Sequence, residues 1–316
     1  MTVVTATTVA AFLLCAGAEV ATADDAVTRV VPLTSLASRE AAQSLVSAAV
    51  ATGVQALLVP VSLFAEPPAV LADVVSSARA QGLRVVASVD VTLAAGANEL
   101  PAARDHVIYT HPEWLMVPRE LALELARMDV HSPDYAGRLA RWTRANAETA
   151  SGLYLSPVHR DAAAFVANAV RGLVERYGFD GVQFDTARYP SGDFDYSRLT
   201  LGALREEIRV GLPPDERRRM DRIEAFDPLA YATEFPEAWR RFRQTQLTAL
   251  VVRVRTAVKA VKPDAVVSAV VGSDPSKSLS EHLQDWATWI DNRFVDAVTT
   301  DERSVTAIRS NSSGTR

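Results

Sequence analysis

The sequence has one cysteine, Cys15, among 316 residues, and fewer basic than acidic side chains. A single cysteine can form neither an internal disulfide nor a multi-cysteine zinc site, so packing must stabilise the fold. The 33 Lys and Arg residues against 38 Asp and Glu residues give a formal net charge of -5. That sign is wrong for a protein that follows a phosphate backbone, and we expect no nucleic acid partner.

Long apolar runs are also missing. The longest candidate, residues 9–17, is shorter than the ~20 residues of a transmembrane helix, so we expect no membrane span. Ala21-Thr22-Ala23 follows it, in the small-x-small pattern that signal peptidase accepts. We therefore interpret residues 1–23 as a signal peptide of a secreted or periplasmic protein. Because the usual basic residues are absent from its start, the alternative is a misassigned start codon upstream of a cytoplasmic protein.

Motifs of several other enzyme classes are absent. The sequence has no Gly-x-Ser-x-Gly elbow and no Gly-x-Gly-x-x-Gly phosphate loop, which argues against the usual serine hydrolases and dinucleotide-binding enzymes. Its five histidines show no metal-ligand spacing. We predict no metal and no cofactor.

After residue 26, short β-branched runs alternate with helical ones, a pattern typical of βα units around a parallel sheet. The predicted strands are residues 28–36, 54–63, 83–90, 179–185, 264–272 and 294–300. The predicted helices are residues 39–52, 67–81, 161–177, 237–262 and 279–290. Two long insertions, 91–157 and 191–236, interrupt the alternation. We expect the first to be a loop with short helices and the charged run 216–222 of the second to be a solvated helix face.

The number of units predicts an incomplete barrel. Each further βα unit of a (β/α)8 barrel needs roughly 30 residues, whereas 16 residues follow Thr300. We therefore expect an α/β, TIM-barrel-like domain of about six βα units over residues 24–303, followed by a disordered tail over 304–316. Such a sheet would keep two unpaired edges, through which the chain could form homo-oligomers.

The fourth predicted strand becomes polar at its carboxyl end. Because strand side chains alternate, Val182 and Phe184 share a face suited to packing under helices. Gln183 and Asp185 share the other face, which in a barrel points toward the mouth. Catalytic groups of such barrels lie at the carboxyl ends of strands, so Asp185 is the leading functional candidate, with capping of the following turn as the alternative. We expect Asp180, at the opposite end, to have a structural role.

Several stretches of the chain stand in an order and spacing that resemble one known family. They are His111-Pro112-Glu113-Trp114-Leu115, Gly152-Leu153-Tyr154-Leu155-Ser156-Pro157, Arg176-Tyr177-Gly178-Phe179-Asp180-Gly181, Phe184-Asp185, Arg188-Tyr189-Pro190, Phe194-Asp195-Tyr196 and Gln284-Asp285-Trp286. From residue 105 to about residue 298, the chain resembles the bacterial glycosyl hydrolase-like family 10 domain, which is related to (β/α)8 glycoside hydrolases. The resemblance implies a barrel that acts on a polysaccharide or oligosaccharide, with hydrolysis as the favoured activity.

The chain also departs from the family pattern. Gln183 stands where the family usually has a histidine, and Ser88 and Asp90 replace its usual Trp and Asn. Residues 64–67 replace an arginine-bearing sequence, and residues 299–303 replace a Pro-Met-x-Tyr strand end. These departures keep an alternative open: a non-catalytic carbohydrate-binding protein, or an inactive truncated fragment of such an enzyme.

Glycoside hydrolysis needs two carboxyl groups. We predict Asp185 as nucleophile or base and Asp274 as acid, because Asp274 continues the inward parity of the fifth strand just beyond its end. Asp90 has the inward parity of the third strand, so either Asp90 or Asp274 could face the same mouth, and we predict that Asp90 binds substrate there. Asp301 and Glu302 follow the sixth strand but rank lower, because the chain has already departed from the family pattern there.

Further side chains are predicted to bind the sugar. The Gln183 amide can hydrogen-bond a sugar hydroxyl. Arg188 and Tyr189 could hold substrate oxygens, or they could pack the loop. Trp114 could stack on a sugar face, as could Trp142, although local core packing is the alternative for both.

Overall fold

A computed structural model describes residues 28–30, 38–98 and 100–300 of the chain. The predicted signal peptide 1–23, with Cys15, and the predicted tail 304–316 lie outside these residues. None of the described helices combines the length and apolar character that crossing a membrane requires.

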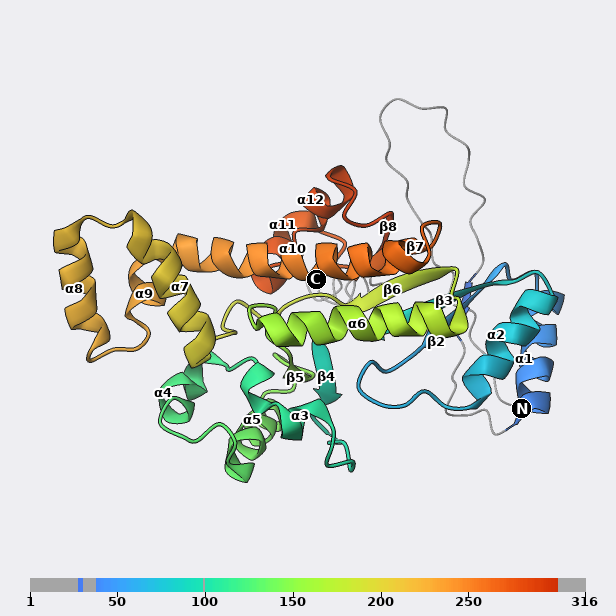
Figure 1. The fold of residues 1–316 in the computed structure, drawn as a ribbon, viewed down its shortest axis with the longest axis horizontal. Helices are drawn as coiled ribbons and strands as arrows, with labels where there is room; N and C mark the ends of the chain where they lie inside the picture. Colours follow the sequence, from blue (N-terminus) through green and yellow to red (C-terminus); the bar gives the residue numbers. More distant parts are fainter. Residues whose placement is uncertain (1–27, 31–37, 99, 301–316) are drawn as a thin grey trace, which may run out of the picture.

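The described residues form a six-stranded parallel sheet whose strands follow one another in sequence order (Figure 1). The strands are β1 (Thr28–Val30), β2 (Ala56–Pro60), β3 (Arg84–Asp90), β6 (Gly181–Thr186), β7 (Val266–Val271) and β8 (Ala297–Thr300). Consecutive parallel strands are the arrangement of a (β/α)8 barrel, so the predicted fold class is confirmed. Strands β2, β3, β6, β7 and β8 are each shorter than predicted, and residues 31–36 of the first predicted strand lie outside the described residues. Within the described residues β1 and β8 form the two edges of the sheet, which does not close.

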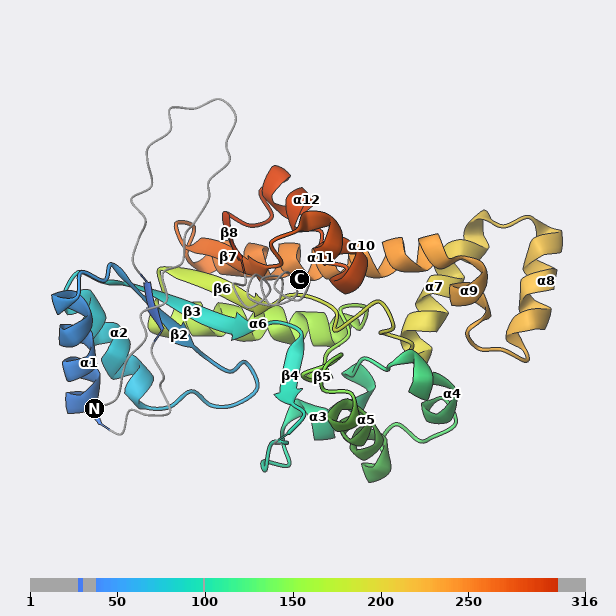
Figure 2. The same ribbon diagram turned by 180° about the vertical axis from the view of Figure 1, so that it is seen from behind.

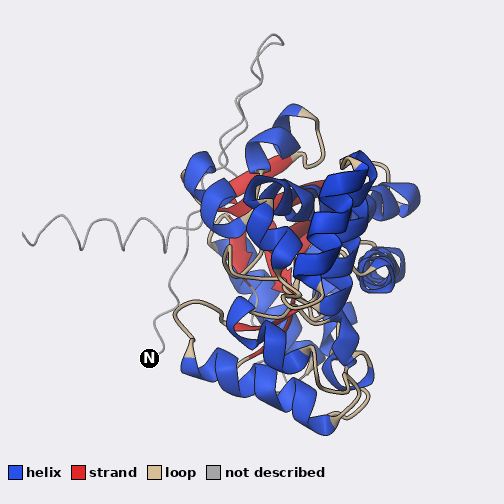
Figure 3. Ribbon diagram, turned by 90° about the vertical axis from the view of Figure 1, so that its left-hand side faces the viewer, coloured by secondary structure: helices blue, strands red, loops and turns tan. Residues whose placement is uncertain are grey.

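Helices cover the sheet, as Figure 3 shows in end view. They include α1 (Arg39–Ala51), α2 (Val70–Ala80), α6 (Arg160–Tyr177) and α10 (Pro236–Val261). The long α10 lies along α6. Gly178 ends α6 in the left-handed conformation, with φ 69°, which glycine adopts without a Cβ penalty. The bounds of all four helices lie within three residues of the predicted ones, so the sequence prediction of these helices is confirmed.

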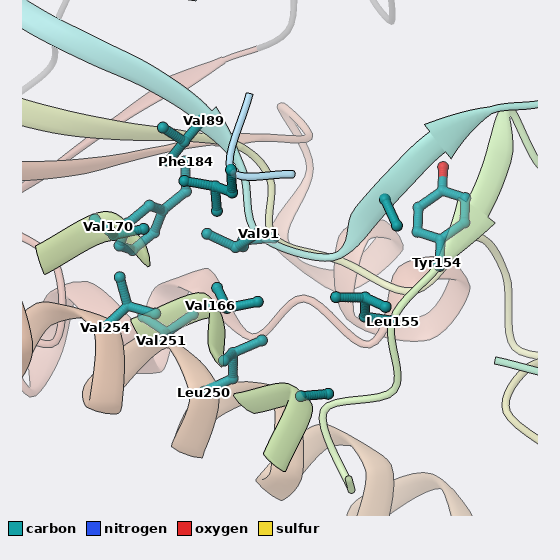
Figure 4. Close-up of a cluster of buried hydrophobic side chains, with 14 of the residues drawn as sticks. Val89, Val91, Tyr154, Leu155, Val166, Val170, Phe184, Leu250, Val251 and Val254 are labelled. Atoms are coloured by element: carbon teal, nitrogen blue, oxygen red, sulfur yellow. The ribbon is translucent and has the colours of Figure 1, made fainter. Parts of the chain in front are cut away.

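One face of β3 and β6 packs under α6 and α10 (Figure 4). Val182 and Phe184 are both 0% exposed, so the prediction that they face the helices is confirmed. The surrounding buried side chains are Val89 of β3, Val91 just after it, Val166 and Val170 of α6, and Leu250, Val251 and Val254 of α10. Because this face is filled with apolar groups, the polar residues of β6 are left on the opposite face.

The single helix predicted over residues 279–290 is wrong. The structure has two short helices instead, α11 (Pro275–His282) and α12 (Trp286–Asp291). Leu283 ends α11 in the left-handed region, with φ 56°. The carboxylate of Asp285 then accepts a hydrogen bond from the Thr288 backbone N–H and caps α12. Apolar spacing across residues 279–290 resembled one helix because it continues through this break.

The first insertion has more regular structure than predicted. It contains β4 (Leu93–Gly96), α3 (Val107–Thr110), two short 3-10 helices (Pro112–Trp114 and Arg119–Leu121), α4 (Ala122–Leu125), the 13-residue α5 (Pro133–Ala145) and β5 (Gly152–Tyr154). β4 and β5 pair as an antiparallel ribbon. The predicted loop with short helices is corrected accordingly. A three- or four-residue strand carries too few alternations to be detected in sequence.

The second insertion forms α7 (Arg198–Gly211), α8 (Pro214–Glu224) and α9 (Ala230–Glu234). The charged run 216–222 lies in α8, where Arg219 pairs with Glu216 and Glu234, so the predicted solvated helix face is confirmed. Both insertions start at carboxyl ends of strands, β3 and β6, and they meet. The Arg119 backbone N–H donates to the Asp193 carbonyl at 2.9 Å, and Pro118 and Phe194 form an antiparallel β-bridge.

Candidate active site

The carboxyl ends of β3 and β6 bring polar side chains together on one face of the sheet. Ser88 pairs with Gln183 and Val89 with Phe184, but Asp90 pairs with Thr186. The register shift makes Asp185 the extra residue of a β-bulge. Bulges are frequent next to active sites because they redirect a side chain, and here the redirected side chain is a carboxylate.

Two neutral donors hold the Asp185 carboxylate. The Gln183 amide donates to Oδ1 at 3.0 Å, and the Ser88 hydroxyl donates to Oδ2. Gln183 and Asp185 therefore share a face, as the strand alternation predicts. These bonds run along β6 and across to β3, so the structure gives no support to the alternative in which Asp185 caps the following turn.

A cavity of about 260 Å³ opens beside these residues. Ser88, Asp90 and Asp185 line it together with Phe64 from the loop after β2 and Leu93–Gly96 of β4. We call it the strand-end cavity. β4 follows shortly after the end of β3 in the chain (Figure 2). The position of the cavity at the carboxyl ends of parallel strands is the usual place of barrel active sites.

The pKa of the Asp90 carboxyl is raised in this cavity. Burial raises the pKa of the Asp90 carboxyl, and the negative charge of Asp185 raises it further. A hydrogen bond with Thr186 and the positive charge of Arg188 act in the opposite direction. The cavity therefore contains one carboxyl group that retains its proton to higher pH than usual, next to another that two donors hold in place.

The prediction for Asp274 needs a correction. Its side chain is exposed, and it accepts a hydrogen bond from the Lys277 backbone N–H at 3.0 Å as the N-cap of α11. It is not among the residues that line the strand-end cavity. The parity argument failed because β7 ends at Val271, and side chains beyond a strand end no longer alternate. Asp90 is the second carboxyl group that lines this cavity.

Two predicted substrate-binding residues lie in the core instead. Tyr189 is 0% exposed, with the Arg243 guanidinium 5.8 Å from its ring centroid. Trp114 is 6% exposed and stacks on His111 at a centroid distance of 4.1 Å. Neither ring is accessible to a sugar, so for both residues the alternative of local packing holds.

The remaining predicted residues lie in different surroundings. Gln183 orients Asp185, and the charge of Arg188 acts on Asp90, so both support the carboxyl groups; direct contact of either with a substrate stays a prediction. Trp142 is half-buried and lines a separate cavity, described below. Asp180 accepts a hydrogen bond from the Val85 backbone N–H at 2.9 Å, which confirms its structural role.

Sequence reasoning missed three parts of the cavity. The hydroxyl of Ser88 was recognisable as inward-facing from its parity with Asp90, but its bond to Asp185 was not. Phe64 lies in a loop without a periodic pattern, and β4 is too short to detect. No group of three or more His, Cys, Asp or Glu side chains among the described residues is arranged to hold a metal ion.

Comparison with known proteins agrees with this geometry. The family model described as glycosyl hydrolase-like 10 matches residues 65–302. The chain belongs to this family. The resemblance identified from the sequence motifs is thereby confirmed. A search of curated proteins gave no match.

Solved structures with the same fold include three β-galactosidases. The enzyme from Bacillus circulans sp. alkalophilus is 13% identical with a TM-score of 0.53, covering 87% of this chain and 39% of its own. The enzyme from the haloarchaeon Halorubrum lacusprofundi is 14% identical with a TM-score of 0.50, covering 87% and 39%. The enzyme from Marinomonas ef1 is 12% identical with a TM-score of 0.50, covering 79% and 38%. This glycosyl hydrolase-like 10 chain thus shares the barrel fold of glycosidases and spans under two fifths of the length of these solved chains.

Proposed function

We propose that the chain is a glycoside hydrolase that cleaves a polysaccharide or oligosaccharide in the strand-end cavity, with Asp90 and Asp185 as its two carboxyl groups. The observation that supports this function is their arrangement on adjacent strands around one cavity, where burial raises the pKa of Asp90 and the charge of Asp185 raises it further. Glycosidases require one carboxyl group as proton donor and a second as nucleophile or base. Membership of the family favours the same chemistry.

Asp90 has the properties of the proton donor. A raised pKa keeps a carboxyl group protonated closer to neutral pH, where it can protonate the glycosidic oxygen as the bond to the anomeric carbon breaks. In the proposal this proton passes from Asp90 to the leaving oxygen. The electron pair of the broken bond stays on that oxygen, so the leaving sugar departs as a neutral alcohol.

Asp185 has the properties of the negatively charged partner. Its carboxylate either attacks the anomeric carbon or removes a proton from the water that attacks there, and the anomeric configuration of the first product decides between the two. Gln183 and Ser88 position both of its oxygens, so its charge is preorganised for the developing positive charge of the sugar.

We further propose that the protein acts outside the cytoplasm. Two arguments support this: residues 1–23 have the sequence pattern of a signal peptide, and polysaccharides of the proposed kind are found outside the cell. N-terminal sequencing of the protein secreted from its native host tests the proposal. Residue 24 at the mature N-terminus supports it, and an intact N-terminus recovered from the cytoplasm contradicts it.

The test of the function is release of reducing sugar from a panel of plant and bacterial polysaccharides. We expect the wild-type chain to release sugar from at least one of them. Asp185→Asn should abolish release without lowering Tm, because the amide keeps the size of the side chain. Asp274→Asn is the matched control and should retain activity, since asparagine also caps helices and residue 274 lies apart from the cavity.

Other outcomes would contradict the proposal. Full activity of Asp185→Asn would exclude the strand-end cavity, and loss of activity in Asp274→Asn alone would restore Asp274 as the acid. Binding of polysaccharides by the wild-type chain without turnover would favour the non-catalytic alternative. The anomer formed by the active enzyme would assign a retaining or an inverting mechanism.

A further inference from the structure

The two insertions enclose a second cavity, which no part of the proposed reaction uses. Its volume is about 540 Å³, twice that of the strand-end cavity and within the ~300–1,000 Å³ typical of ligand sites. The residues that give it its chemical character are Arg119, Glu120, Trp142, Asn146, Asp193 and Leu229. We call it the insertion pocket.

The indole of Trp142 is fixed in this pocket but not covered. Its Nε1–H donates to the Glu120 carboxylate at 2.7 Å, and its ring meets that of Phe194 edge to face, with the centroids 5.6 Å apart. The side chain is only half-buried. A ring that is held by these two contacts and still partly accessible offers a preformed apolar platform, which loses little entropy when a ligand stacks on it.

Polar groups of both kinds surround the platform. Glu120 and Asp193 provide carboxylates, Arg119 a guanidinium and Asn146 an amide. Arg119 and Asp193 are both exposed at the pocket. Among the described residues, neither has a salt-bridge partner within 4 Å. Side chains of mixed donor and acceptor character beside an aromatic face match the chemistry of a sugar ring, which has one apolar C–H face and a rim of hydroxyls.

The charge of the pocket narrows the class of sugar. Two carboxylates, of Glu120 and Asp193, face one guanidinium, of Arg119. An excess of negative charge disfavours a carboxylate-bearing sugar such as a uronic acid, since like charges repel. The hydroxyls of a neutral sugar can donate to these carboxylates without such a penalty.

The insertion pocket lies on the same side of the sheet as the strand-end cavity. Both insertions leave the carboxyl ends of strands, and the backbone carbonyl of Ala97, one residue beyond β4, accepts a hydrogen bond from Arg144 of α5 at 3.5 Å. β4 lines the strand-end cavity, and α5 carries Trp142. The ribbon and helix thus connect the two cavities within one insertion.

We propose that the insertion pocket is a carbohydrate subsite that binds a neutral sugar unit of the polymer, with that unit stacked on Trp142. This inference rests on the proposed function for its ligand class, because it takes the substrate to be a carbohydrate. It adds a second contact for a long chain outside the reacting cavity.

The test is affinity electrophoresis of the intact chain in gels that contain galactan, xylan, β-glucan or polygalacturonate. The Asp185→Asn background prevents digestion of the polysaccharide. We expect retardation by at least one neutral polymer, and Trp142→Ala should weaken that binding by about tenfold. Trp142→Phe should bind with intermediate affinity, since the smaller ring keeps the platform and its contact with Phe194. Phe226→Ala, at an aromatic residue that is 93% exposed outside the pocket, is the control and should bind as before.

The outcomes separate this inference from the proposed function. Neutral-polymer binding that depends on Trp142 supports the subsite even if no hydrolysis is ever observed. Equal binding by the Asp185→Asn protein with and without Trp142→Ala would overturn it, provided that their Tm values show both proteins to be folded. Retardation by polygalacturonate alone would overturn the neutral-sugar class, and no retardation by any polymer would overturn the subsite.

Discussion

Two regions of the molecule each contain an aspartate whose pKa is raised by burial. One is the strand-end cavity, and the other is the core around Asp195, which we call the core region. Asp90 lines the cavity beside Asp185, and Arg188 is the nearby cation. Asp195 is 0% exposed, and it accepts a hydrogen bond from the Thr200 hydroxyl at 2.9 Å in the neighbourhood of the buried Arg243. The two carboxyl groups are shifted in the same direction by the same cause.

What separates the two regions is access and partnership. Asp90 is open to a cavity and has a second carboxylate next to it, so a substrate can reach both groups. Asp195 is enclosed, and one of its oxygens accepts a hydrogen bond from the Thr200 hydroxyl inside the core. We therefore infer a functional site from a raised pKa only where a cavity and a chemical partner accompany it.

The largest expected effect concerns the cavity. Asp90→Asn removes the proposed proton donor and should lower kcat/KM by about 10³-fold, within the range of general acid catalysis. Tm should not fall. A substrate with a nitrophenyl leaving group, which departs without protonation, should lose much less activity, and parallel assays on the two substrates measure the difference. An equal loss on both substrates would contradict the role of Asp90 as acid.

Next in size is the stability of the core region. Asp195→Ala should lower the free energy of unfolding by about 3 kcal/mol, because the buried Arg243 and Thr200 lose a carboxylate next to them. Urea denaturation measures it. Asp193→Ala, two residues earlier and exposed, is the matched control and should change stability by less than about 0.5 kcal/mol. Similar changes in the free energy of unfolding for the two variants would contradict a stabilising role of the buried Asp195.

A smaller effect is expected at Gln183. Gln183→Met removes one hydrogen bond that orients Asp185, worth about 1 kcal/mol, so kcat should fall by about fivefold with little change in KM. Gln183→His restores a donor of the kind the family usually has at this position, and kcat should recover. If both variants lost activity equally, the hydrogen bond to Asp185 would not be the cause.

The smallest effect is a pH dependence of stability. Because its pKa is raised in the folded state, Asp90 keeps its proton to higher pH there than in the unfolded chain. The stability that it contributes is present below the ordinary pKa of 3.8 and is lost as the pH rises through the folded-state pKa. Asp90→Asn carries no charge at any pH, so its stability relative to wild type should increase from acidic to neutral buffer. A constant difference across that range, measured by urea denaturation, would contradict the shift.

Most of the sheet and of the helices that cover it could be predicted from the sequence. Buried strands have near-continuous apolar runs, and each covering helix has one apolar face, so both leave a recognisable pattern. The positions of Val182 and Phe184 under α6 and α10 followed from alternation alone. The break at Leu283 could not be predicted, since it depends on a left-handed backbone conformation stabilised by tertiary contacts, and the apolar pattern runs on through it.

The candidate site was predictable in part. Asp185 and its shared face with Gln183 followed from the polar end of one strand. Parity placed Asp90 in the same mouth, but the β-bulge between β3 and β6 is a property of two strands together and leaves no local signal. The predictions for Asp274 and Tyr189 were wrong because both residues lie beyond a strand end. There, only the three-dimensional path of the loop decides whether a side chain caps a helix, packs in the core or contacts a ligand.

The most direct test of the central claim is an NMR titration of the Asp90 side-chain carboxyl carbon in the wild-type chain and in Asp185→Asn. It needs no substrate. If the two carboxyl groups share the cavity, the pKa of Asp90 lies above 3.8 in the wild type and falls when the charge of residue 185 is removed. An Asp90 pKa that is the same in both proteins would show that the two groups do not interact, and it would contradict the proposed acid and charge pair.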